Sequence, residues 1–427
     1  MNIEQIIIYE QDNYLAFYPF SIMHPVWELR VGAMRLFEKY RNIYPEIPIV
    51  FHSKRTLQML SFLERFGLDN SPLEKRNTLI VTAGFLPDKM LMDAMEKRIE
   101  DAGGCSFAFR DRKRTVALYL RADEIISTEG ESVEFLRRMI NEYSLMFEGA
   151  ELAELGRLEA EAENLWSAIY HNAEAIRSDS VFFDDFRRFE QSRFPLVAAV
   201  KPENIRIGAS VKIAPLCSLD ATDGKIIIDE DAEIMSGTTI IGPAYIGKNT
   251  KIKVGAKIYP GVSIGEHCKI GGEVEDSIIQ AYANKQHDGF LGHSFLSEWV
   301  NLGAGTNTSD LKNTYGEIVI EIEKFALHSG RQFLGLLCGD HTKSAIGTSF
   351  ATGTVAGICS SVVARGLTPK SIHSFSFGGE ENSPYLDIYK AETIARKVME
   401  RRSRFLSDVE IELMHKEFEN TKRIFGK

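Results

Sequence analysis

A polar segment from 284 to 316 holds the side chains best suited to chemistry. It contains His287, and the motif NLGAGT begins fourteen residues later, at Asn301. An imidazole has an ordinary pKa of about 6.5, so it is suited to take a proton from a reacting group near neutral pH. Gly303 and Gly305 let the backbone approach a ligand closely, and backbone amides can then stabilise a developing oxyanion. The segment therefore contains residue types that are suited to proton transfer and to binding an anion.

An unusual repeat must position this segment. Aliphatic residues recur every sixth position, which an α-helix with about 3.6 residues per turn cannot produce. Six residues make one short strand and one corner, so three such units close a coil whose aliphatic side chains share one dry axis. The pattern predicts a left-handed parallel β-helix from about 200 to 365. The series is Ile207, Ile213, Leu219, Ile228, Ile234, Ile240, Ile246, Ile252, Ile258, Ile264 and Ile270, and it resumes at Phe290, Leu296 and Leu302, then at Ile346, Thr352 and Ile358.

The first part of the chain has a different pattern. Short β-rich runs alternate with helical patterns, which predicts an α/β, Rossmann-like domain with a parallel sheet covered by helices. We expect strands at 6–10, 47–52 and 78–83, helices at 53–67 and 87–103, a strand pair at 105–110 and 115–121, and mostly helix from 131 to 188. The last residues return to helix, with Ser383 and Pro384 at one start and a capping box at 407–410. The predicted domains are 1–192, including a helical linker, 193–382 and 383–427.

The segment 284–316 and the repeat together resemble a known enzyme family. They are similar to the bifunctional N-acetylglucosamine-1-phosphate uridyltransferase/glucosamine-1-phosphate acetyltransferase, and to bacterial sugar-nucleotidyltransferase-like proteins built on that plan. The resemblance implies that His287 is the general base on a glucosamine amine, with acetyl-CoA as cosubstrate. It also implies a homotrimer, with Asn301, Gly303, Ala304 and Gly305 at the substrate and acetyl-CoA site.

Several positions depart from the family pattern, which puts the sugar more in doubt than the reaction. Phe290 stands where the family has a tyrosine that holds the sugar phosphate, and Glu275 stands where it has a lysine. Asp310 and Leu311 replace an Asn-Tyr pair near the CoA site. Lys285 and Lys312 are nearby cations that are candidates to bind the phosphate in place of the missing lysine. The resemblance assigns the segment around Asp340 to the CoA cleft.

The N-terminal domain shows little of the chemistry of a nucleotidyltransferase. That family uses a glycine-rich loop after the first strand and an acid that binds Mg²⁺ after a later one. Here 11–20 contains no glycine, and no carboxylate follows the strand at 78–83 until Asp88. Arg30 and Lys39 lie in the segment 25–40, which is similar to a motif of the nucleotidyltransferase-like group. They are candidates to pair with phosphates. The alternative is that both lie on a solvated helix face. We expect a degenerate domain that uses Mg²⁺ only if it is active.

Composition excludes several classes of function. The chain has 60 acidic and 50 basic residues, a net charge of -10, which disfavours binding to nucleic acid or to anionic membranes. Five cysteines without a paired framework indicate reduced thiols, and Cys217 and Cys268 fall at small, buried positions of the repeat. We expect no signal peptide, no membrane span, no resident metal and a cytoplasmic location.

Three functions stay open at this point. The first is an acetyl-CoA-dependent N-acetyltransferase that acts on an amino-sugar phosphate or nucleotide sugar. The second is a sugar-1-phosphate nucleotidyltransferase that uses the β-helix for oligomerisation. The third is a non-catalytic protein that binds nucleotide sugars and has a regulatory role.

Overall fold

The chain packs into two compact units in the computed structural model. The structure describes residues 3–70, 73–112, 114–125, 132–156, 161–322, 324–380 and 382–426. The first unit comprises Met1–Phe17, His24–Leu29 and Met34–Glu163, and the second comprises Tyr18–Met23, Arg30–Ala33 and Asn164–Lys427. In these described ranges, no helix is both long and apolar enough to cross a membrane.

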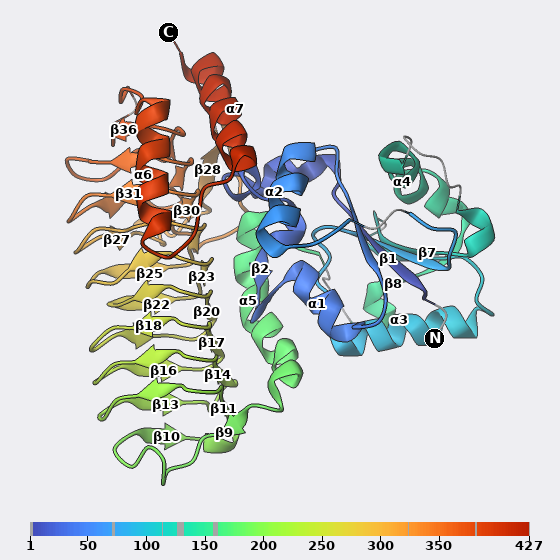
Figure 1. Ribbon diagram of the computed structural model, residues 1–427, viewed down its shortest axis with the longest axis horizontal. Coiled ribbons are helices and arrows are strands. Elements are labelled where there is room, and N and C mark those ends of the chain that lie inside the picture. Colours follow the sequence, from blue (N-terminus) through green and yellow to red (C-terminus); the bar gives the residue numbers. More distant parts are fainter. Residues whose placement is uncertain are drawn as a thin grey trace. The chain divides into compact units, whose positions relative to one another are not determined.

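The first unit contains a six-stranded mixed sheet (Figure 1). The predicted strands at 6–10, 47–52 and 78–83 form its parallel part, because β1 is parallel to both of its neighbours. The predicted strand pair is also present as the hairpin of β6 and β7, and β7 pairs antiparallel with β5. In sheet order the strands are β4 (Ile49–His52), β1 (Gln5–Tyr9), β5 (Thr78–Thr82), β7 (Arg114–Leu120), β6 (Phe107–Asp111) and β8 (Glu148–Glu151).

The helices of the first unit follow the predicted pattern. Gly67 has φ of 59° and ends α2 in the left-handed conformation. Asp88, which was not predicted as a cap, is the N-cap of α3 and accepts a hydrogen bond from the Leu91 amide at 2.8 Å. The region from 131 to 188 is less helical than predicted, because β8 lies within it. The helices are α1 (Leu36–Ile43), α2 (Thr56–Phe66), α3 (Lys89–Asp101) and α4 (Ser132–Asn141).

A buried ion pair holds part of the first unit together. Glu28 lies 2.5 Å from Arg65 and 3.1 Å from Nδ1 of His24, and its side chain is 1% exposed. Burial by itself would raise the pKa of Glu28, but Arg65 and then His24 outweigh it and hold the pKa well below its usual value. The carboxylate therefore stabilises the unit only while it is ionised.

This ion pair predicts a specific pH dependence. Because the folded-state pKa of Glu28 is depressed, its contribution is complete above the ordinary value of 4.5 and is lost as the pH falls below it. We expect Glu28→Gln to lower the free energy of unfolding at pH 7 by about 3 kcal/mol, since it leaves buried partners unpaired. Urea denaturation between pH 7 and pH 3 should show a shallower acid slope for the variant. Asp69→Asn, at an exposed position, should leave the slope unchanged.

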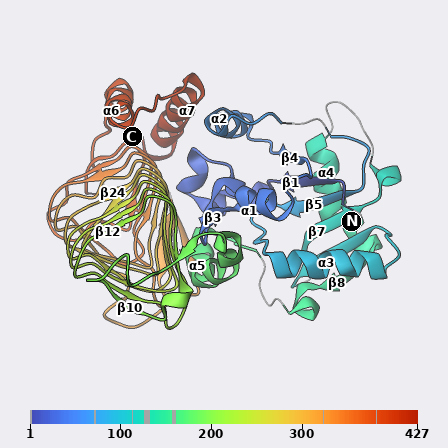
Figure 2. The same cartoon turned by 60° about the horizontal axis from the view of Figure 1, so that its bottom comes forward.

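The second unit is a β-solenoid, which confirms the predicted fold class. Each strand pairs parallel with the strand one coil further on, and Figures 1 and 2 show the coils stacked on one another. The first face has β10 (Ala198–Val200), β13 (Ser218–Asp220), β16 (Thr239–Ile241), β19 (Lys257–Ile258), β22 (Glu273–Glu275) and β25 (Phe290–Gly292), followed by the pair β27 (Asn307–Thr308) and β32 (Ser349–Phe350).

The other two faces are built in the same way. The second has β11 (Ile205–Ile207), β14 (Ile226–Ile228), β17 (Ala244–Ile246), β20 (Val262–Ile264), β23 (Ile278–Ile279), β26 (Phe295–Leu296), β30 (Leu337–Cys338), β33 (Val355–Ala356) and β35 (Ser371–Ile372), with β9 (Arg187–Arg188) antiparallel at its edge. The third has β12 (Lys212–Ile213), β15 (Glu233–Ile234), β18 (Lys251–Ile252), β21 (Lys269–Ile270) and β24 (Asn284–Lys285), then β31 (Lys343–Ser344), β34 (Ser361–Val362) and β36 (Phe377–Gly378).

The aliphatic series forms the solenoid core as predicted, except at its end. The eight isoleucines from Ile228 to Ile270 are buried, as are Cys217 and Cys268. Leu291, not Phe290, faces inward, because the corner before Leu296 is one residue shorter than the repeat predicts. The later register is also wrong by two residues, since Ile346 lies 80% exposed at a corner. The inward residues there are Cys338, Ser344, Phe350, Ala356 and Val362.

An excursion and the chain end complete the second unit. The excursion at 309–336 carries a hairpin of β28 (Val319–Ile322) and β29 (Phe325–His328). The solenoid continues past 365 to β36. The predicted helix start at Ser383 is wrong, because the adjoining Pro384 carbonyl accepts a hydrogen bond from the Phe377 amide in the last coil. Asp387 is the cap instead, while the capping box at 407–410 is confirmed. The helices of this unit are α5 (Leu165–Asp179), α6 (Ile388–Glu400) and α7 (Asp408–Phe425).

Candidate active site

Two successive coils bring His287 and the NLGAGT motif to the same corner of the solenoid. The Gly305 amide donates to the carbonyl of Asp288 at 3.0 Å, and the Leu302 amide donates to the carbonyl of Asn284 at 2.8 Å. Asn284 and Asn301 also form a parallel bridge between the coils. The loop that carries His287 therefore lies directly against the loop that carries the glycines.

The His287 side chain is available to a ligand. It is exposed, and among the residues that the structure describes its imidazole has no hydrogen-bond partner. Gly289, two residues later, has φ of 125°, and a Cβ at that position would lie 2.0 Å from the Thr306 carbonyl oxygen. The two loops approach this closely only because residue 289 has no side chain.

The glycine loop offers fewer amide donors than the sequence suggested. Gly303 donates to Oγ of Ser344 at 3.0 Å, and Gly305 is already bonded to Asp288. Within the described part of the chain, the Ala304 amide has no acceptor. Of the three predicted positions, Ala304 is therefore the one whose amide is left to bind a ligand.

Lys285 is placed below this corner and inside the solenoid. It pairs in register with Ile270 and so occupies an inward position of the aliphatic series. Its ammonium donates to the carbonyls of Gly271 at 2.8 Å and His287 at 3.0 Å, and the residue is 2% exposed. Burial lowers the pKa of Lys285 to about 8. The lysine fastens the His287 loop to the coil beneath it.

The buried lysine predicts a stability change on the alkaline side. The unfolded chain holds this proton up to a pH of about 10.5, whereas the folded protein releases it at about 8. Stability should therefore rise with pH between these values, because the unfolded state binds more protons there. We expect Lys285→Met to remove this slope, measured by urea denaturation from pH 7 to pH 10.5. Lys251→Met, at an exposed position, should retain it.

Phe290 and Asp310 meet on the outer surface of the first face. A Cβ at Gly292 would lie 2.5 Å from the Phe290 ring and 2.4 Å from Oδ2 of Asp310, so both side chains converge over this glycine. Asp310 lies 2.8 Å from Nδ1 of His293, whose Nε2 lies 3.5 Å from Asp276. The surface beside the His287 corner thus combines an aromatic ring with a histidine between two carboxylates.

Sequence reasoning missed this histidine, although its spacing contained a signal. Asp276, His293 and Asp310 follow one another at intervals of 17 residues. That interval is one turn of the solenoid in these coils, as the pairing of Glu275 with Gly292 also shows. Polar residues that recur once per coil are therefore placed in one column.

Two predicted residues lie apart from the His287 corner. Asp340 is buried at the corner between the second and third faces, where it accepts a hydrogen bond from Oγ of Ser297 at 2.9 Å. Lys312 lies in the excursion and donates to the carbonyl of Glu317 at 2.9 Å. Both have polar partners within the chain, and neither is brought to His287 by these contacts.

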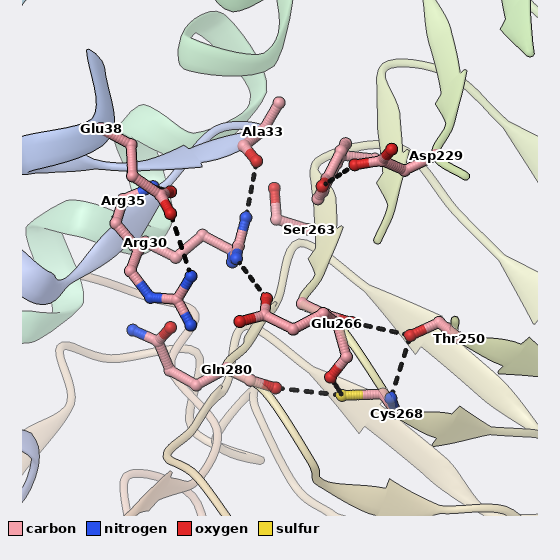
Figure 3. A network of polar contacts seen from close by, with 12 residues as sticks. Arg30, Ala33, Arg35, Glu38, Asp229, Thr250, Ser263, Glu266, Cys268 and Gln280 are labelled. Carbon is pink, nitrogen blue, oxygen red and sulfur yellow. Dashed lines mark hydrogen bonds and ion pairs between the residues drawn. The ribbon is translucent and has the colours of Figure 1, made fainter. Parts of the chain in front are cut away.

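The two cations of the N-terminal motif are buried, so the alternative of a solvated helix face is wrong for both. Arg30 donates to Glu266 at 2.8 Å and to the carbonyl of Ala33 at 2.6 Å (Figure 3). Its guanidinium also lies over the ring of Tyr245. Lys39 lies in α1 and is 1% exposed. Arg30 is thus bound to the solenoid coil that carries Glu266.

The first unit has its own polar cavity, of about 240 Å³. Glu161 is buried in its wall and lies 2.6 Å from Arg114. Burial raises the pKa of Glu161. The described residues contain no cluster of three or more His, Cys, Asp or Glu side chains arranged to hold a metal ion. The cavity is lined by Gln11, Arg114, Thr115, Ile140, Asn141, Ser144, Leu145 and Glu161.

Comparison with family models confirms the resemblance for two segments. Residues 6–188 match the model described as Sugar nucleotidyl transferase. Residues 243–275 match the model described as Bacterial transferase hexapeptide (six repeats). The chain therefore joins a nucleotidyl transferase-like segment to a hexapeptide-repeat segment, in the order that the sequence predicts.

Parts of the chain are similar to proteins with curated names, one of which is a transferase by its name. A bifunctional sugar-1-phosphate nucleotidylyltransferase/acetyltransferase from Sulfurisphaera tokodaii is 38% identical over 136 residues, covering 31% of this chain and 34% of that protein. The bifunctional protein GlmU of Methanococcus aeolicus is 29% identical over 177 residues, covering 41% and 40%. The matches thus span well under half the length of these relatives. The solved structure of LpxA, a UDP-N-acetylglucosamine acyltransferase from Bacteroides fragilis, is 14% identical with a TM-score of 0.24, covering 53% of this chain and 96% of that one.

Proposed function

We propose that the solenoid transfers the acetyl group of acetyl-CoA to the amine of an amino sugar at the His287 corner. The observation that carries this proposal is the contact between two loops on successive coils. One loop carries His287, whose exposed imidazole has no hydrogen-bond partner among the described residues, and the other carries the Ala304 amide. The names of the relatives, which include acetyltransferase activity, support the same reaction class. Resemblance adds an amino-sugar phosphate or nucleotide sugar as the expected acceptor and a homotrimer as the expected assembly.

The proposed chemistry is a single acyl transfer. The neutral amine attacks the thioester carbonyl, and His287 accepts the proton that the amine loses as the new C–N bond forms. The amide of Ala304 donates to the oxygen that becomes negative in the tetrahedral intermediate. The C–S bond then breaks, and CoA leaves as a thiolate that takes up a proton. Asn301, at the edge of the glycine loop, is expected to orient the thioester.

Release of free thiol from acetyl-CoA tests this proposal. The full chain should release thiol only when an amino sugar is added, and both glucosamine and glucosamine-1-phosphate serve as trial acceptors. N-acetylglucosamine, whose amine is already blocked, is the matched control and should give no release. Thiol release at the background rate with every amine would contradict the proposed acyl transfer.

A second function, nucleotidyl transfer by the first unit, is favoured by the family match over 6–188 and by the polar cavity. Two observations argue against catalytic turnover in this unit. Glu10 follows β1, where the family has a glycine-rich loop, and its carboxylate already binds Arg55 at 2.5 Å and Ser53 at 2.6 Å. We infer a degenerate domain that binds a sugar nucleotide without turnover. Pyrophosphate release from UTP or dTTP with a sugar phosphate and Mg²⁺ would overturn that inference.

A further inference from the structure

We propose that the acceptor at the His287 corner is an amino sugar without a phosphate group, selected by the carboxylates of the adjoining face. This inference rests on the proposed acetyl transfer and names its substrate class. It departs from the acceptor that the resemblance implies. The residues that carry it are Phe290 and the acidic group made of Glu275, Asp276 and Asp310.

The strand that follows His287 leads directly to this acidic group. Phe290 on β25 pairs in register with Glu273 on β22, and Gly292 pairs with Glu275. The outward-facing residues of the two strands therefore lie side by side. The Phe290 ring and the Asp310 carboxylate converge over Gly292. A sugar whose amine reaches His287 therefore extends over an aromatic ring toward carboxylates.

His293 fixes the far end of this surface. Its two ring nitrogens lie 2.8 Å from Asp310 and 3.5 Å from Asp276, and its side chain is 15% exposed. The ring also stacks on Phe333, with the ring centroids 5.1 Å apart. One imidazole therefore faces the three carboxyl groups of the acidic group.

Four cations near this face have partners among the described residues. Lys285 is buried on two carbonyl oxygens, and Lys312 donates to the carbonyl of Glu317. Lys257 is paired with Glu273 at 2.9 Å. Arg331 lies over the ring of Tyr170 at 4.1 Å. A phosphate that turned to any of these four cations would therefore have to displace an existing partner.

The carboxylates already repel one another. Burial, together with the neighbouring carboxylates, raises the pKa of Glu275 and of Asp276, although His293 opposes the shift. A phosphate carries about two negative charges near pH 7 and would add to this repulsion. Sugar hydroxyls instead donate hydrogen bonds to carboxylates, and the apolar face of a sugar ring packs on an aromatic side chain. The surface therefore fits an unphosphorylated amino sugar.

Steady-state kinetics with two acceptors test the inference. The wild-type protein should have a kcat/KM for glucosamine roughly tenfold or more above that for glucosamine-1-phosphate, because like charges disfavour the second acceptor. Glu275→Lys places a cation where the resemblance has one, and it should shift this ratio at least about tenfold toward the phosphate. The shift should shrink at high salt, which screens charges. Glu203→Lys makes the same charge change at an exposed position of the first coil and should leave the ratio unchanged.

Separate outcomes overturn the inference and the underlying function. A wild-type preference for glucosamine-1-phosphate, or an unchanged ratio in Glu275→Lys, overturns the inference while acetyl transfer still stands. No thiol release with either acceptor overturns the acetyl transfer itself. Should Glu275→Lys fail to fold, Asp310→Asn removes one charge with little change in shape and should shift the ratio in the same direction.

Discussion

Replacement of His287 by alanine is expected to lower kcat/KM for acetyl transfer by about 100-fold to 10,000-fold, the usual contribution of a general base. The imidazole is exposed and has no partner among the described residues, so its loss removes no contact that stabilises the fold. The melting temperature should therefore stay within about 1 °C of the wild type, since such surface changes alter stability little. The measurement is thiol release at saturating acetyl-CoA over a range of acceptor concentrations.

A second histidine provides the control for this variant. His328 lies in the exposed hairpin of the excursion, and its side chain is 77% exposed. His328→Ala should retain the wild-type rate. If His287→Ala retained wild-type activity, His287 would have no role in the reaction.

Replacement of Gly289 by alanine is expected to destabilise the solenoid and to abolish acetyl transfer. The new Cβ would lie 2.0 Å from the Thr306 carbonyl oxygen, and the backbone at φ of 125° disfavours any side chain. Backbone strain of this kind costs about 1–3 kcal/mol, and relief of the clash must move the His287 loop away from the glycine loop. We expect a lower melting temperature and a kcat reduced by about 100-fold, because small displacements in an active site have effects of this size.

Gly255→Ala is the matched control for this second variant. Gly255 also has a positive φ, of 69°, but a Cβ there would meet no atom within 4 Å. The substitution should cost about 1 kcal/mol and leave kcat unchanged. If Gly289→Ala behaved in the same way as Gly255→Ala, the close contact between the two loops would not be needed for catalysis.

The solenoid was predictable because its repeat is visible in one dimension. The isoleucines every six residues define the coil without knowledge of any long-range contact, and all eight of the uninterrupted series are buried. The register after Ile270 was harder, because corners shortened by one or two residues break the period. Lys285 shows the limit clearly, since nothing in its residue type predicts an inward position in line with Ile270.

The candidate site was predictable only in part. The interval between His287 and Asn301 identified one corner, and the hydrogen bond between Gly305 and Asp288 joins the two loops there. Local sequence patterns do not show which amides of the glycine loop lack an acceptor. They also do not show that Arg30 binds Glu266, because this contact joins distant segments of the chain. The column of Asp276, His293 and Asp310 required the coil length of 17 residues, which the predicted period of 18 obscured.

The measurement that tests the central claim most directly is the mass of the acceptor after incubation with acetyl-CoA and the full chain. Wild-type protein and His287→Ala should be compared in parallel, with glucosamine as the acceptor. We predict that the wild-type protein converts the amine to its N-acetyl product and that the variant leaves the acceptor unchanged over the same time. An acceptor that stays unmodified with the wild type, or is acetylated equally by both proteins, would contradict acetyl transfer at the His287 corner.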